Sequence, residues 1–180
     1  MESYHSKFNS TEADLACNIP LLPVQTKDAY SNDTSAHDIV DEAIALFRAN
    51  IFFKNYKVEG PADRTLVFLT CFIQKMLEQM ARFPEQEKAA RVVGLIMAEP
   101  SILDVQSANH FMNKLGLLKV NPTISEKQKC AEYLKTLMRE CSKRLLEYLY
   151  RPEEGEMNRK FWLGFGKKTF LGQKFVDKQF

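Results

Sequence analysis

Three histidines, His5, His37 and His110, are the residues of this 180-residue chain best suited to acid–base chemistry, and they are scattered among segments that look like loops. None lies in an HExxH motif or in a cysteine–histidine pattern with metal-site spacing, and there is no GxSxG motif. The adjacent carboxylates at 41–42 and 153–154 are better explained by a helix start and a polar turn. We therefore expect no catalytic, metal-binding or cofactor-binding residue, no cofactor and no enzymatic activity.

The run GFGKKT at 164–169 superficially resembles a phosphate-binding loop. A Walker A motif needs a glycine five residues before its Gly-Lys pair and a Ser or Thr after the lysine. Here the first position holds Phe161, and Lys167 is followed by Lys168. The match to that motif fails.

Charge is distributed unevenly along the chain, although the formal net charge is only +2. Residues 1–42 carry eight acidic residues against two lysines, whereas residues 156–180 carry six basic residues against two acidic ones. Oppositely charged ends suggest two separate contact regions, and a plain solvated surface is the alternative for either end.

The basic C-terminal end is also aromatic, and it admits several interpretations. Single-stranded nucleic acid is one partner that such a segment fits, but the pI of 8.3 and the lack of an RNA-binding motif count against it. Three glycines between 164 and 172 disfavour an amphipathic membrane-surface helix. Docking onto another protein fits better, and packing on the chain's own helices is about equally compatible with each of its aromatic residues: Phe161, Trp162, Phe165 and Phe170.

The first 37 residues mix small polar residues and proline around the short apolar run NIPLLPV at 18–24. Its two prolines exclude a helix. We expect Ile19, Leu21, Leu22 and Val24 to lie extended, as a strap on the protein surface, with surface loops on either side.

A helical pattern begins at Asp38, which is a good N-cap residue. Val40, Ile44, Phe47 and Ile51 then recur at helical spacing and predict one buried stripe.

A second helix is expected to begin at Pro61, after the break at Gly60, and to run to about Arg82. Residues 66–73 are apolar on every side except at Thr70, which predicts a central buried helix around which the others pack.

A third helical stretch is expected to begin near Pro84, and residues 101–122 fit one or two short helices with a turn at Gly116. Thr123 or Ser125 can cap a fourth, long helix. It should end at Arg151-Pro152, and one face is marked by Cys130, Leu134, Leu137, Cys141, Leu145 and Tyr148.

No segment shows convincing strand alternation, so the predicted class is all-α. We expect a single compact domain over 1–180, made of an extended segment at 1–37, a helical core at 38–150 and a basic, aromatic segment at 151–180. Four cysteines without a CxxC pair predict reduced thiols and a cytoplasmic protein. The longest apolar stretch is too short to span a membrane, and the polar N-terminus does not resemble a secretory signal.

The run ANIFFKNYKV at 49–58 carries more apolar surface than one helix face can bury. If the helix continued through residue 56, Phe53 and Tyr56 would lie nearly opposite the buried stripe. Either this helix is sandwiched between neighbours, or Phe53 and Tyr56, with Lys54 and Lys57 around them, meet another chain.

Residues 38–70, DIVDEAIALFRANIFFKNYKVEGPADRTLVFLT, closely resemble the corresponding run of the family of actin-related protein 2/3 complex subunit 3, the small p21 subunit. Tyr4-His5-Ser6, Leu21-Leu22-Pro23 and RKFWLGFGKKTF at 159–170 extend the resemblance in collinear order over about two thirds of the chain. Residues 83–122 depart from it, because this chain lacks the Gly/Pro-rich turn of the relatives there.

The resemblance implies a non-catalytic structural subunit of a seven-member assembly that nucleates branched actin filaments. Its chief partner would be the actin-related protein 3 subunit, it would meet the actin filament through the complex, and ATP would belong to the actin-related subunits. It would work at the cytoplasmic actin cytoskeleton, without nucleic acid or membrane. The expected partner-binding residues are Tyr4, Phe53, Lys54, Tyr56, Lys57, Phe161, Trp162, Lys167 and Lys168.

Overall fold

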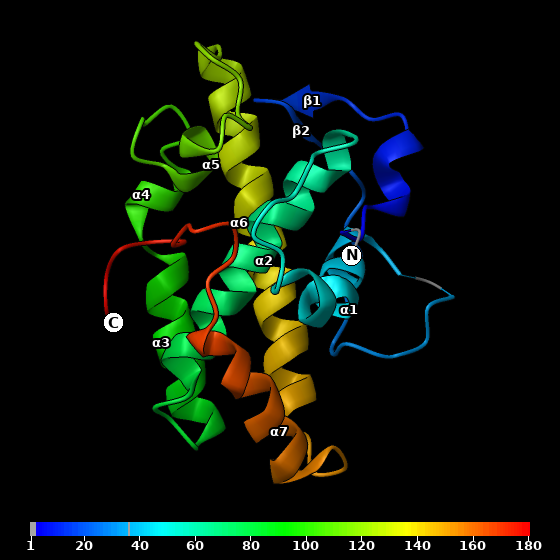
Figure 1. Cartoon of the computed structure of the whole chain (residues 1–180), viewed down its shortest axis with the longest axis vertical. Helices are drawn as coiled ribbons and strands as arrows, with labels where there is room; N and C mark the ends of the chain where they lie inside the picture. Colours follow the sequence, from blue (N-terminus) through cyan, green and yellow to red (C-terminus); the bar gives the residue numbers. More distant parts are fainter. Residues whose placement is uncertain (1–2, 36) are drawn as a thin grey trace.

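The computed structural model describes residues 3–35 and 37–180, and this part of the chain is mostly helical (Figure 1). The elements are η1 (Lys7–Ser10), β1 (Leu15–Ala16), β2 (Ile19–Pro20), α1 (Ile39–Asn50), α2 (Pro61–Met80), α3 (Gln86–Met97), α4 (Pro100–Leu103), α5 (Phe111–Lys114), α6 (Ile124–Tyr150), α7 (Gly155–Gly164) and η2 (Phe165–Lys167).

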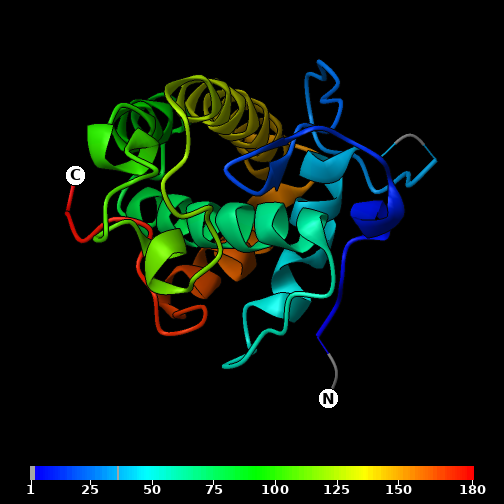
Figure 2. The same ribbon diagram turned by 90° about the horizontal axis from the view of Figure 1, so that it is seen from above.

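Helix α2 lies at the centre, with α1, α3, α6 and α7 packed around it (Figures 1 and 2). Every residue from 66 to 73 is buried, as predicted. The one polar side chain among them, Thr70, donates a hydrogen bond to the Leu66 carbonyl at 2.6 Å, so its hydroxyl is satisfied inside the core. Pro61 occupies the first turn of the helix, also as predicted.

Helix α1 begins where expected, because the Asp38 carboxylate accepts hydrogen bonds from the backbone N–H groups of Val40 and Asp41. The predicted stripe from Val40 to Ile51 is buried throughout. The helix ends at Asn50, however, so the projection through residue 56 was wrong. Phe52 and Phe53 follow in a turn, and a helical wheel does not describe where their side chains point.

Helix α6 confirms its predicted start, since Thr123 and Glu126 form a reciprocal capping box. Its predicted apolar face is buried from Cys130 to Tyr148, and the helix ends before Arg151. Residues 100–114 form the two short helices expected there, and Gly116 turns the chain with a φ of 69°.

The β-hairpin, helix α7 and the short 3-10 helices η1 and η2 were not predicted. Strands β1 and β2 form a small antiparallel pair, so the all-α class needs that correction. Cys17 and Asn18 join them with φ values of 52° and 71°, and positive φ at both central residues is the signature of a type I′ hairpin turn. In α7, Trp162 packs against Phe47 of α1.

The N-terminal segment is held against the helices at several points. Residues 21–27 form no helix or strand, Ile19 and Leu22 are buried, and the buried guanidinium of Arg144 in α6 contacts both the Gln25 carbonyl and the Asp38 carboxylate. Within the described ranges, no helix has the length and apolar character needed to cross a membrane.

Candidate protein interface

Two segments from distant parts of the sequence meet beside α1. The end of α1 supplies Phe47, whose ring stacks on that of Trp162 in α7 with centroids 6.0 Å apart. The following turn supplies Phe52, whose ring lies edge-on to Phe165 at 5.9 Å. The aromatic residues near 52 and near 161 therefore belong to one surface region, although more than 100 residues separate them.

An exposed patch of large apolar side chains covers this junction, and we define the aromatic patch as Phe52, Met157 and Phe161. Phe52 is 57% exposed and Phe161 is 54% exposed, on either side of the buried Phe165. Met157 lies one helical turn before Phe161 and is also exposed. A contiguous exposed group of large apolar side chains is typical of a surface that another protein covers.

Cations border the aromatic patch. The guanidinium of Arg48 lies 5.7 Å from the ring centroid of Phe161, and the Lys168 ammonium lies 5.5 Å from that of Phe52. These are cation–π distances. Lys167 beside them is exposed. An apolar centre with a charged rim matches the anatomy of protein interfaces.

A second exposed aromatic, Tyr4, is presented by the N-terminal segment. Its backbone N–H donates to Asn50 Oδ1 at 3.0 Å, and its carbonyl accepts from Asn50 Nδ2 and from the Tyr56 hydroxyl. Burial, followed by the nearby Asp63 carboxylate, raises the pKa of Tyr56, so this hydroxyl stays protonated and donates. The backbone of Tyr4 is thus fixed while its side chain is 52% exposed.

Some of the predicted partner-binding residues are exposed in the structure, and others are partly or fully buried. Lys54 and Lys57 are exposed, but Phe53 and Tyr56 are half-buried against the core. Trp162 is a correction, because it is only 2% exposed and packs between the rings of Phe47 and Tyr148. The physical reason is that α7 buries this face against α1 and α6.

Phe52 is the residue that sequence reasoning missed. Because α1 ends at Asn50, Phe52 is exposed and the neighbouring Phe53 is half-buried. The sequence had favoured Phe53 as the exposed residue of the pair. The available signal was the pair itself, since one of two adjacent phenylalanines was expected to face outward.

Comparisons with known proteins show the family to which the chain belongs. The family described as P21-Arc, ARP2/3 complex ARPC3 (21 kDa) subunit, matches residues 1–175. This chain belongs to that family. Similar proteins named actin-related protein 2/3 complex subunit 3 come from Schizosaccharomyces pombe, 36% identical over 96% of this chain and 99% of the relative, and from Dictyostelium discoideum, 34% identical over 94% and 98%. A third, from Arabidopsis thaliana, is 33% identical over 93% and 96%.

Membership in the P21-Arc family confirms the resemblance seen in the sequence, and the matched range includes the aromatic patch and Tyr4. The relatives are named as subunits of a protein complex. Nothing in these comparisons supports the nucleic-acid alternative.

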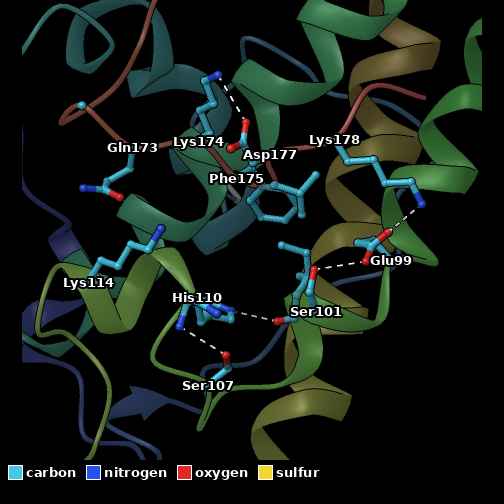
Figure 3. A pocket seen from close by; sticks show the side chains of 14 residues that line it. Glu99, Ser101, Ser107, His110, Lys114, Gln173, Lys174, Phe175, Asp177 and Lys178 are labelled. Carbon is cyan, nitrogen blue, oxygen red and sulfur yellow. Dashed lines mark hydrogen bonds and ion pairs between the residues drawn. The ribbon is translucent and has the colours of Figure 1, made fainter.

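A pocket lies between the α4–α5 region and residues 172–178 (Figure 3). Its volume is about 610 Å³. Two of its lysines are paired, Lys174 with Asp177 at 3.3 Å and Lys178 with Glu99 at 3.2 Å. His110 is buried and hydrogen-bonded at both ring nitrogens, and its burial lowers its pKa. Of these contacts, the Lys178–Glu99 ion pair joins the C-terminal segment to the residue that precedes α4.

Proposed function

We propose that this chain is a non-catalytic structural subunit of the actin-related protein 2/3 complex and supports nucleation of branched actin filaments. The observation that carries the proposal is the family match over residues 1–175, together with relatives that align over nearly their whole length. An exposed aromatic patch on a mostly helical chain is the feature that a subunit of a larger assembly needs.

Within the complex, we propose the actin-related protein 3 subunit as the chief partner, with contact to the actin filament made through the complex. The aromatic patch is the candidate contact surface. Tyr4, Phe53, Lys54, Tyr56, Lys57, Lys167 and Lys168 are proposed to extend it. The exposed members supply contact area, and the half-buried Phe53 and Tyr56 support the turn and the N-terminal segment that present them.

We further propose that residues 1–180 act as one domain at the cytoplasmic actin cytoskeleton. The support is a single cluster of buried residues that draws on the N-terminal segment, the helices and the C-terminal segment. A structural subunit needs a rigid domain with one core, because it must hold its partners in a fixed arrangement.

The test is co-purification of the tagged full-length chain with its partners through a high-salt wash, followed by mass spectrometry. We expect two actin-related proteins and four further small subunits to stay bound to it. The double variant Phe52→Ala, Phe161→Ala should lose most of this recovery, since buried aromatic anchors carry about 2 kcal/mol or more each in interfaces. High salt weakens contacts between exposed charges, so an aromatic interface should survive the wash.

The matched control is Leu95→Ala, because Leu95 is as exposed as Phe52 but lies on α3. It should leave recovery unchanged. Recovery of the chain alone in the wild type would contradict the subunit assignment. Full recovery with the double variant would contradict only the aromatic patch.

A further inference from the structure

The GFGKKT loop lines a small cavity against α2, with a volume of about 110 Å³. Gly166 brings the loop onto the helix, since a Cβ atom there would lie only 2.5 Å from the backbone nitrogen of Glu78. The Gly166 carbonyl accepts a hydrogen bond from Gln74 Nε2 at 2.8 Å. The loop is therefore fixed on α2, and Lys167, Lys168 and Thr169 follow directly along the cavity wall.

Positive charge dominates the lining of this cavity. Four lysines and one carboxylate, that of Glu78, line it, and the lysines are Lys75, Lys167, Lys168 and Lys174. The Lys168 ammonium lies 5.5 Å from the Phe52 ring centroid, at the rim of the aromatic patch. Burial acts to raise the pKa of Glu78, but hydrogen bonds from Lys75 and Gln79 outweigh it and lower that pKa, so the carboxylate is ionised. The Lys174 ammonium also pairs with Asp177 outside the lining, at 3.3 Å. The lysines still outnumber the carboxylates.

Lys75 gives the strongest indication of a bound anion, because its charged side chain is only 4% exposed. Its ammonium group has three donors. Among the described residues, one acceptor meets them, Glu78 Oε2 at 2.8 Å, and the Phe180 ring lies 5.9 Å away. A buried cation with spare donors is costly unless an acceptor fills the space beside it.

The size of the cavity narrows the class of ligand. A volume of 110 Å³ is room for about four water molecules, which suits one tetrahedral oxyanion and is well below the roughly 300 Å³ at which pockets for drug-sized molecules begin. An oxyanion offers several acceptor oxygens and a negative charge that the lysine ammonium groups favour.

We propose that this cavity binds a single phosphoryl group, held by Lys75 from α2 and by Lys167 and Lys174 from the C-terminal segment. The phosphoryl group can come from free phosphate or from an inositol phosphate headgroup, and both present the same chemistry. The site differs from a Walker A loop, because lysine side chains from two elements replace the cradle at a helix N-terminus. It binds the anion without a reaction.

The test is calorimetric titration of the full-length chain with inorganic phosphate, at an ionic strength kept constant with sodium chloride. We expect saturable binding at one site. Lys75→Met and Lys174→Gln should each weaken it about tenfold or more, the effect of one lost charge-assisted hydrogen bond. Lys135→Gln removes the same charge on α6, outside the cavity, and should bind as the wild type does.

A parallel titration with inositol trisphosphate separates the two sources. Binding of both anions, weakened by the same two substitutions, would support a phosphoryl site open to either, and binding of the trisphosphate alone with that dependence would assign the headgroup. Saturation by neither anion, or equal weakening by Lys135→Gln, would overturn the proposal. If Lys75→Met does not fold by circular dichroism, the exposed Lys174→Gln decides, and neither lysine belongs to the aromatic patch.

Discussion

At the scale of single residues, Arg144 connects the N-terminal segment to the helices, a role that no sequence pattern around it predicts. Its guanidinium is fully buried and lies 2.7 Å from Asp38, 3.2 Å from Asp41 and 3.3 Å from Glu140. It also donates to the carbonyl of Gln25. One side chain thus joins α6, the start of α1 and the segment that leads into it.

Replacing Arg144 with methionine should destabilise the protein by about 3–5 kcal/mol, because it leaves Asp38 and Asp41 buried without this partner. Urea unfolding followed by circular dichroism measures the change. Arg139→Met is the matched control on the same helix, where the side chain is exposed, and it should change stability by less than about 0.5 kcal/mol. Equal effects of the two substitutions would show that the buried network does not hold the segment.

At the scale of elements, packing rather than local preference places the C-terminal segment. Gly155 and Gly164 end α7, which carries no side-chain cap at either end, so its ten residues would be marginal in isolation. Trp162 and Phe165 bury this helix and η2 against the core. Helix α7 therefore depends on α1 and α2 being in place.

Gly166→Ala tests that dependence. The added methyl group would meet the α2 backbone, which cannot yield as a flexible side chain does. We expect a loss of about 1–3 kcal/mol in the free energy of unfolding. In contrast, nothing lies within 4 Å of a Cβ at Gly164, so Gly164→Ala should be neutral or stabilise by up to about 1 kcal/mol. Thermal unfolding of both variants distinguishes the two sites, and a stable Gly166→Ala would mean that η2 can move off α2.

At the scale of the whole molecule, segments near both ends of the described chain are fastened to α2. Asp63 of α2 accepts hydrogen bonds from the Ser6 and Glu59 backbone and from His5. At the other end, the Phe180 N–H donates to Gln79 of α2. The aromatic patch exists because this arrangement places α7 beside α1.

The acid side of the stability profile should report the N-terminal attachment. Burial alone would raise the pKa of Asp38 and Asp63, but hydrogen bonds outweigh it, chiefly from Arg144 to Asp38 and from the Ser6 backbone to Asp63, and both pKa values are lowered. A lowered folded-state pKa contributes stability above the unfolded value of about 3.9. That contribution is lost as the pH falls through the folded value.

We therefore expect the urea midpoint to fall as the pH is lowered from about 5 towards 3. Asp38→Asn and Asp63→Asn should each lower the midpoint near neutral pH and flatten its decline in acid. The exposed Asp28→Asn is the control and should follow the wild-type curve. An unchanged slope in both core variants would contradict the role given to these carboxylates.

The sequence by itself determined the helices whose signals are local. Asp38, Pro61 and the Thr123–Glu126 capping box mark helix starts through contacts within one turn. Apolar spacing identified the buried faces of α1 and α6, and the apolar run at 66–73 identified α2 as the central helix. The resemblance to the family could also be read directly from contiguous stretches of sequence, and the family match confirms it.

Only the tertiary structure decided which aromatic residues are exposed and which lysines gather. Phe52 points outward and Trp162 inward because α1 ends early and α7 packs beside it. Lys75 and the GFGKKT loop are about 90 residues apart in sequence, and they line the same cavity because Gly166 packs directly against the α2 backbone. The physical reason is that caps and periodicity act between neighbours along the chain, whereas exposure and charge clustering depend on contacts between segments that are distant in sequence.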